Sequence, residues 1–248
     1  SMLVPCYNEA NTIEQIVAAI RKIPVRTEII CIDDASTDNS KEILRKLEEN
    51  GKIDRLVSHN QNRGKGAAIR SGLAKATGDI VIVQDADLEY DPQEIPHLIQ
   101  PILCGKADAV FGSRFRGALP GRVLYFWHRI GNGLLTLFSN MLTNLNLTDM
   151  ETCYKAIRTD LAKQLILTSD RFGVEPEITA RLAQSKARIY EVGISYYGRT
   201  YEEGKKITWK DGIAAFWHIL RYNFVERSKI SAKNLSSFRN FVTGRLAK

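Results

Sequence analysis

The first 112 residues alternate short apolar runs with segments of helical periodicity, and this alternation restricts the chain to few folds. Apolar runs bounded by turn residues predict strands, and apolar residues at every third or fourth position predict helices. The predicted strands cover residues 3–4, 28–32, 53–58, 79–83 and 107–112, and the predicted helices cover 11–23, 38–49, 65–76 and 93–103. Such a series forms a mostly parallel sheet with helices on both faces. The sequence therefore predicts an α/β fold of the Rossmann-like type.

The second half of the chain is less regular. Residues 119–147 are rich in Leu, Phe, Tyr and Trp, which fits either a core helix or a helix whose apolar face lines an acceptor groove. Later elements are predicted as strands at 153–157 and 189–197 and helices at 161–167, 176–184 and 209–224. The last helix has one apolar face, which we expect to pack on the sheet as core; the alternative is that it lies on a membrane. This face contains Ile213, Phe216, Trp217, Leu220 and Phe224.

The length fits one large domain with an appendage. We predict one domain over residues 1–227, with a first half at about 1–115 and a second half at about 116–227. Residues 228–248 form a tail whose charges are all basic, expected either as an amphipathic helical extension on an anionic membrane or as a disordered end. The longest uncharged run, 130–148, contains four Asn residues, so no transmembrane helix is predicted.

The amino-acid composition limits the classes of partner that this chain is expected to bind. The chain has 35 basic and 28 acidic residues, a net charge of +7, which favours an anionic partner. No nucleic-acid-binding motif accompanies the basic residues, so nucleic acid is not an expected partner. The four cysteines are widely separated and include no C-x-x-C pair, which predicts neither a zinc site nor a disulfide framework. A reducing, cytoplasmic compartment is therefore expected.

Acidic residues follow directly on the predicted strand 79–83. Asp85, Asp87 and Glu89 alternate with other residues, and in an extended chain residues two apart point the same way. Three carboxylates that converge on one point suit a hard divalent cation, Mg²⁺ or Mn²⁺. An acidic turn without a metal is the alternative. We predict these three residues as metal ligands.

The other strand ends exclude two kinds of nucleotide site. Glu9 follows the first strand, and Asp33 and Asp34 end the second. The chain has neither G-x-G-x-x-G after its first strand nor a phosphate-binding G-x-x-x-x-G-K-[ST] loop. Carboxylates repel a diphosphate, but they hold it through a bridging metal or bind ribose hydroxyls and base edges. The pattern predicts a site for a nucleoside diphosphate carried on a cation.

Seven motifs, which cover about residues 3–210, resemble a known family. This chain is similar to the family-2 inverting glycosyltransferases with the GT-A fold at residues 4–9 (VPCYNE), 33–38 (DDASTD), 62–67 (NRGKGA) and 85–87 (DAD). It resembles more narrowly the branch of dolichol-phosphate mannose synthase and related polyprenyl-phosphate hexosyltransferases at residues 111–115 (FGSRF), from 149 (DMETCYK) and at 197–200 (YGRT).

The resemblance implies that residues 1–227 are a GT-A catalytic domain, with a nucleotide-sugar half at about 1–115 and an acceptor half at about 116–227. It also implies roles for residues of the donor site. Asp85 and Asp87 would hold Mg²⁺ or Mn²⁺ against the donor diphosphate, and Glu89 stands where the synthases usually have Gln as a third ligand. The base and ribose would be surrounded by Pro5, Tyr7, Glu9, Asp34 and Lys65. For Tyr7 a packing role is the alternative.

The acceptor site is expected to be cationic. A phosphate monoester is already ionised near neutral pH, because its second pKa is ~6, so a lipid-phosphate acceptor needs no general base. It does need positive side chains, since two anions must approach each other. The candidates are Arg114, Arg129, Arg199 and Lys206, each with a solvated surface charge as the alternative.

Asp149 has two possible roles. A hydroxyl acceptor would need it as a general base, whereas with a phosphate acceptor it would orient an Arg or lie near the metal. Cys153 stands where Gly is common in the family, and we interpret it as a packing variant.

These observations predict a metal-dependent inverting transferase that moves a hexose to a polyprenyl phosphate at the cytoplasmic membrane face, with possible peripheral membrane contact. GDP-mannose is the favoured donor and UDP-glucose the second. One alternative is a soluble family-2 transferase acting on a glycan or protein hydroxyl with Asp149 as base. Another is a non-catalytic nucleotide-sugar-binding module.

Overall fold

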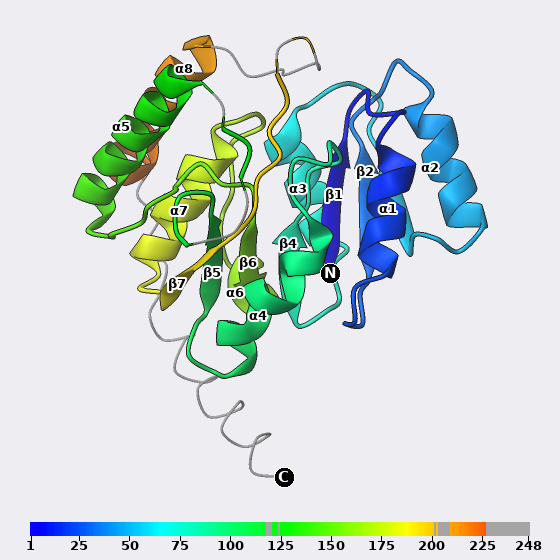
Figure 1. Ribbon diagram of the computed structural model, residues 1–248, viewed down its shortest axis with the longest axis horizontal. Helices are drawn as coiled ribbons and strands as arrows, with labels where there is room; N and C mark the ends of the chain where they lie inside the picture. Colours follow the sequence, from blue (N-terminus) through cyan, green and yellow to red (C-terminus); the bar gives the residue numbers. More distant parts are fainter. Residues whose placement is uncertain (118–120, 124, 201, 203–208, 227–248) are drawn as a thin grey trace.

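The computed structural model describes residues 1–117, 121–123, 125–200, 202 and 209–226. Within these residues seven strands form one sheet in the order β3-β2-β1-β4-β6-β5-β7 (Figure 1). The strands are β1 (Met2–Cys6), β2 (Ile29–Asp33), β3 (Arg55–Ser58), β4 (Ile80–Val83), β5 (Ala109–Ser113), β6 (Lys155–Arg158) and β7 (Ile189–Gly193). β6 runs antiparallel to β4 and β5, and the remaining pairs are parallel. The predicted mostly parallel sheet is confirmed.

Helices cover both faces of the sheet, as predicted (Figure 1). One face carries α1 (Ile13–Arg21), α2 (Ser40–Glu49) and α4 (Ile95–Leu103), which follows the short helix η1 (Pro92–Glu94). The other carries α3 (Lys65–Leu73), α6 (Thr159–Ala162) and α7 (Val174–Gln184). α5 (Phe126–Thr143) and α8 (Trp209–Leu220) pack side by side next to α7, and α8 continues into the π-helical turn η2 (Arg221–Val225).

The core explains why the first half was predictable. All five residues of β2 are buried, and β1 pairs with it from Met2 opposite Ile29 to Cys6 opposite Asp33. A strand buried on both faces needs a continuous apolar run, which is the pattern that the sequence shows. This register places the carboxyl ends of the two strands side by side.

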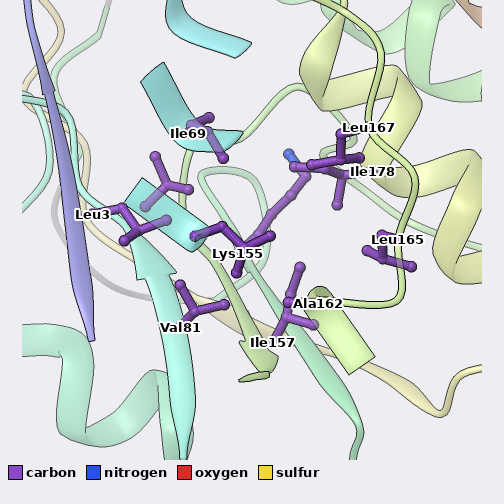
Figure 2. Close-up of a pocket in the computed structure, with 11 residues that line it drawn as sticks. Leu3, Ile69, Val81, Lys155, Ile157, Ala162, Leu165, Leu167 and Ile178 are labelled. Atoms are coloured by element: carbon purple, nitrogen blue, oxygen red, sulfur yellow. The ribbon is translucent and has the colours of Figure 1, made fainter. Parts of the chain in front are cut away.

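A small cavity of about 20 Å³ lies between the sheet and the helices α3, α6 and α7 (Figure 2). Its lining is apolar except for Lys155, whose Nζ donates to the carbonyl of Thr152. Burial lowers the pKa of this lysine. The cavity is far too small for a nucleotide sugar and belongs to the core.

Two predictions about the second half are wrong. The predicted helix 161–167 is only the short α6, because Leu165 and Leu167 are buried while Ile166 between them is exposed, an alternation that a helix cannot provide. The predicted core face of residues 209–224 is largely exposed. α8 and η2 pack inward instead through Ala215, Ile219 and Tyr222.

Among the described residues, no helix has both the length and the apolar character that crossing a bilayer requires. The tail 228–248 and Lys206 lie outside the described residues, and the division into nucleotide and acceptor halves stays a prediction.

Candidate active site

Neighbouring strand ends bring the predicted donor-site residues together. β1 lies between β2 and β4, so the segments that follow these strands meet at one edge of the sheet. Lys65, the first residue of α3, reaches this edge, where its Nζ lies 2.8 Å from Asp85 Oδ1 and 3.0 Å from Glu175 Oε1. Burial alone would lower the pKa of Lys65, but the adjacent Asp85 carboxylate raises it well above its usual range. The lysine is therefore a fixed cation at the edge where the diphosphate is predicted to lie.

Asp34 organises the loop that carries Lys65. Its carboxylate accepts hydrogen bonds from the backbone N–H groups of Arg63 at 2.9 Å and Gly64 at 2.6 Å, and its Oδ1 lies 2.7 Å from His59 Nδ1. Gly64 has φ +95°, and a Cβ there would lie 2.5 Å from the carbonyl oxygen of Asp170, so only glycine fits. Asp34 thus shapes the nucleotide site; its direct contact with a nucleotide stays a prediction.

Replacing Asp34 with Ala should lower the free energy of unfolding by about 2–4 kcal/mol, because two partly buried backbone N–H groups and the buried His59 lose their partner. Urea denaturation measures this. Glu42→Ala is the control, since Glu42 forms an exposed pair with Lys46 and should change stability by less than about 0.5 kcal/mol. Equal effects of both substitutions would contradict this role of Asp34.

The predicted cluster of Asp85, Asp87 and Glu89 does not form. The chain is not extended beyond β4, because Leu88 adopts a left-handed conformation with φ +63°. Glu89 accepts hydrogen bonds from the Tyr196 hydroxyl at 2.7 Å and the Arg199 backbone N–H at 2.8 Å. Within the described residues, no three acidic, His or Cys side chains are placed to hold one metal ion. The three carboxylates are thus not gathered at one point in this structure, and a role for Glu89 as a metal ligand stays a prediction.

The remaining pair, Asp85 and Asp87, still fits a divalent cation. Burial, followed by the negative charges of Asp85 and Glu89, raises the pKa of Asp87 to about 7. Such crowding of carboxylates is relieved by a positive charge. Mg²⁺ commonly takes only one or two carboxylates and completes its shell with water and substrate phosphates. The donor set thus suits a cation held jointly with a diphosphate, which when bound supplies charge to stabilise the leaving group.

Arg199 is inside this acidic group. Its guanidinium lies 3.2 Å from Asp87 Oδ2 and 3.4 Å from Glu9 Oε1, and its Nε lies 3.6 Å from Glu89 Oε1. The structure therefore brings Arg199 and Glu9 to the predicted metal site, from segments far apart in the sequence. Tyr196 links this group to the next cation, because its ring packs under the Arg114 guanidinium at 5.1 Å.

Arg114 and Asp149 form a buried pair. Arg114 Nε lies 2.6 Å from Asp149 Oδ2 and Nη2 lies 2.7 Å from Oδ1, so the contact is bidentate. Asn132 of α5 accepts from Arg114 and donates to Asp149. Burial would raise the pKa of Asp149, but the guanidinium holds it below its usual range. Asp149 is therefore ionised, with both of its oxygens bound to Arg114, and its role in the reaction stays a prediction.

The other predicted site residues differ in burial and in what they contact. Arg129 packs over the ring of Phe115 at 3.6 Å, the ring that Arg114 also approaches. Tyr7 is 39% exposed at the strand-end edge, and Pro5 lies within β1. Asp33 is fully buried and accepts from the Ser36 N–H, so in this structure it shapes a turn.

Cys153 is buried, with Sγ 3.7 Å from the carbonyl oxygen of Val83, as expected for a packing role. Three residues of the site escaped the sequence interpretation: Glu175, Asn132 and Tyr196. Only Tyr196 had a usable signal, since it directly precedes the 197–200 motif.

Comparisons with known proteins identify the family. Residues 1–166 match the family model described as glycosyl transferase family 2, and this chain belongs to that family. The fold is the GT-A fold: glucosyl-3-phosphoglycerate synthase from Mycobacterium tuberculosis, solved with Mn²⁺, uridine diphosphate and glucosyl-3-phosphoglycerate, superposes with a TM-score of 0.65 at 22% identity, over 88% of this chain and 77% of that one.

Relatives by sequence are polyprenyl-phosphate hexosyltransferases and similar enzymes. A hexosyltransferase of low-salt glycan biosynthesis from Haloferax volcanii is 29% identical over 91% of this chain and 53% of its own length. UDP-N-acetylglucosamine–dolichyl-phosphate N-acetylglucosaminyltransferase from Methanococcus voltae is 27% identical over 88% of this chain and 94% of its own. Undecaprenyl-phosphate mannosyltransferase from Micrococcus luteus is 27% identical over 88% and 96%. The chain thus spans about half of the first of these relatives and nearly all of the other two.

Proposed function

We propose that this protein is a metal-dependent, inverting glycosyltransferase that moves a hexose from a nucleoside diphosphate sugar to a polyprenyl phosphate at the cytoplasmic face of a membrane. The observation that carries the proposal is Arg114, a cation held in a fixed orientation by Asp149 and linked through Tyr196 to the acidic group around Asp87. Such an arrangement offers an anionic acceptor a positive contact next to the donor site.

The reaction needs no proton transfer. An ionised phosphate oxygen of the acceptor attacks the anomeric carbon of the sugar, and the bond from that carbon to the donor diphosphate breaks, with the electron pair leaving on the diphosphate. Lys65 is placed to stabilise the charge that develops there, and Arg114 to orient the attacking phosphate. Asp85 and Asp87 would hold Mg²⁺ or Mn²⁺.

For the donor we propose GDP-mannose first and UDP-glucose second. The named substrates of the relatives include N-acetylglucosamine and mannose, so a sugar panel is the direct measurement. The alternative, a hydroxyl acceptor with Asp149 as base, lacks support from the geometry, because both oxygens of that carboxylate are bound to Arg114.

Transfer assays test the proposal. Purified protein with Mn²⁺, each nucleotide sugar and a short-chain prenyl phosphate should form prenyl-phosphate hexose and release nucleoside diphosphate, and EDTA should stop the reaction. The matched control is the prenol of equal chain length, which has a hydroxyl in place of the phosphate and should accept no sugar. Transfer to prenol or glycan hydroxyls with none to prenyl phosphate would refute the proposal.

A further inference from the structure

The outer face of α5 is apolar although it faces away from the protein. Trp127, Ile130, Leu134, Leu137 and Met141 follow each other at spacings of three and four residues, so they form one stripe along the helix. The exposed fractions are high, at 76% for Trp127, 61% for Leu134 and 71% for Met141. We call these five residues the outer stripe.

The inner face of α5, which packs against the protein, is no more apolar than the outer stripe. Its fully buried side chains are Thr136 and Ser139, beside the partly buried Leu135, Phe138 and Leu142. A helix that is apolar on both sides is normally covered on both sides. The outer stripe is thus an apolar surface exposed to water, and contiguous exposed apolar patches of this kind mark interaction sites.

α8 extends the patch. The ring of Phe216 stacks on that of Phe138 of α5 at 4.2 Å, and Ile213, Trp217 and Phe224 are exposed beside it. The two helices lie next to each other at one corner of the molecule (Figure 1). The exposed apolar surface is therefore not confined to one helix.

The charge of the segment around α5 favours an anionic bilayer over a second copy of the chain as the partner of this surface. Residues 115–148 contain Arg116, Arg122 and Arg129 and no acidic residue. A second copy of the chain that docked through the same segment would bring three more arginines and no carboxylate from it. An anionic bilayer offers both an apolar interior and negative headgroups, and aromatic residues such as Tyr125, Phe126 and Trp127 at one end of a helix favour that interface.

We propose that the outer stripe of α5, extended by α8, is the surface by which this protein docks on an anionic lipid bilayer. The inference rests on the proposed function, because a polyprenyl phosphate acceptor is itself embedded in lipid. The same helix carries Asn132, which contacts Arg114 and Asp149, so docking through its outer side places the acceptor arginine next to the lipid headgroups.

Vesicle cosedimentation tests the docking surface. The unaltered chain should bind vesicles of phosphatidylcholine with phosphatidylglycerol, and the double substitution Leu134→Glu with Leu137→Glu should weaken binding by about tenfold or more. The matched control is Leu103→Glu with Ile166→Glu, which adds the same charge at exposed apolar residues of the α4 end and the α6–α7 connection and should bind like the unaltered chain.

A second measurement separates the outer stripe from the tail. The chain contains tryptophan at 127, 209 and 217, so the variant Trp209→Phe with Trp217→Phe leaves Trp127 as the sole reporter. Its fluorescence should shift to the blue when anionic vesicles are added, also in a chain that ends at residue 226. Equal vesicle binding by both glutamate variants, or binding lost on removal of the tail, would overturn the proposal. So would a dimer that only the Leu134/Leu137 change disrupts, without vesicle binding.

Transfer to a short-chain, water-soluble prenyl phosphate distinguishes this inference from the proposed function. That reaction needs no bilayer, so the Leu134→Glu, Leu137→Glu variant should keep it while losing transfer to acceptor in vesicles. If the unaltered chain docks through α5 but transfers sugar to no prenyl phosphate, the proposed function fails and the docking surface stands.

Discussion

Asp87→Asn should lower kcat for sugar transfer by about a thousandfold. It removes a carboxylate that would hold the metal ion, and the metal ion would neutralise the leaving diphosphate. It should also abolish the Mn²⁺ dependence of donor binding, which isothermal titration calorimetry measures directly. Asp91→Asn is the matched control: Asp91 caps η1 by accepting from the Gln93 N–H, and asparagine caps equally well. An Asp87→Asn protein with Mn²⁺-dependent binding and near-normal turnover would refute the metal role.

The same substitution should stabilise the metal-free protein at alkaline pH. The pKa of Asp87 is about 7 in the folded state against 3.8 ordinarily, so the folded state binds this proton more tightly than the unfolded state does. The carboxylate therefore destabilises the fold increasingly as pH rises from about 4 to about 7 and not below that window. At pH 8 without metal, Asp87→Asn should raise the free energy of unfolding by about 1–2 kcal/mol. The gain should vanish at pH 4.

Activity and stability thus change in opposite directions at Asp87, as expected where a site concentrates like charges for function. Arg199 already balances part of this charge in the folded chain. A loss of stability at pH 8 in the asparagine variant would mean that the pair with Arg199 outweighs the crowding by Asp85 and Glu89.

The first half of the fold was predictable because most of its strands, such as β2 (Ile29–Asp33), are buried on both faces and have continuous apolar runs; the edge strand β3 is an exception. Strand direction has no such signature. The antiparallel β6 lies between β4 and β5, and its pattern does not reveal this place, since pairing partners are set by tertiary packing. Likewise, the periodicity of 209–224 identified which residues share a face but not that Ile219 and Tyr222 would face inward.

The sequence predicted which strand ends lie at the site. Asp34 follows β2 and Asp85 follows β4, and the topology places both strand ends at the edge where Lys65 pairs with Asp85. The convergence of Glu89 with Asp85 and Asp87 was argued from an extended backbone, and Leu88 with φ +63° interrupts that backbone. Asn132 lies 17 residues from Asp149 on a separate helix, and no local pattern reports such a contact.

Asp149→Asn should lower the free energy of unfolding by about 3–5 kcal/mol, because the buried Arg114 guanidinium loses its ionic partner. Transfer to prenyl phosphate should fall but remain measurable, and the pH dependence of kcat should keep its shape, since no proton passes through this carboxylate. Asp108→Asn is the matched control: Asp108 is another buried carboxylate, paired with Arg158 and Arg188 away from the site. It should destabilise the fold comparably and leave transfer intact.

A double substitution separates the structural from the functional share of this pair. Arg114→Met with Asp149→Leu removes both charges at once, and replacement of a buried ion pair by apolar residues is often neutral or stabilising. Stability should therefore return toward that of the unaltered chain, while transfer to prenyl phosphate stays at background because the orienting cation is gone. Transfer that recovers together with stability would mean that Arg114 serves the fold alone. Transfer that disappears with Asp149→Asn, along with the acid limb of the pH profile, would instead identify Asp149 as a base.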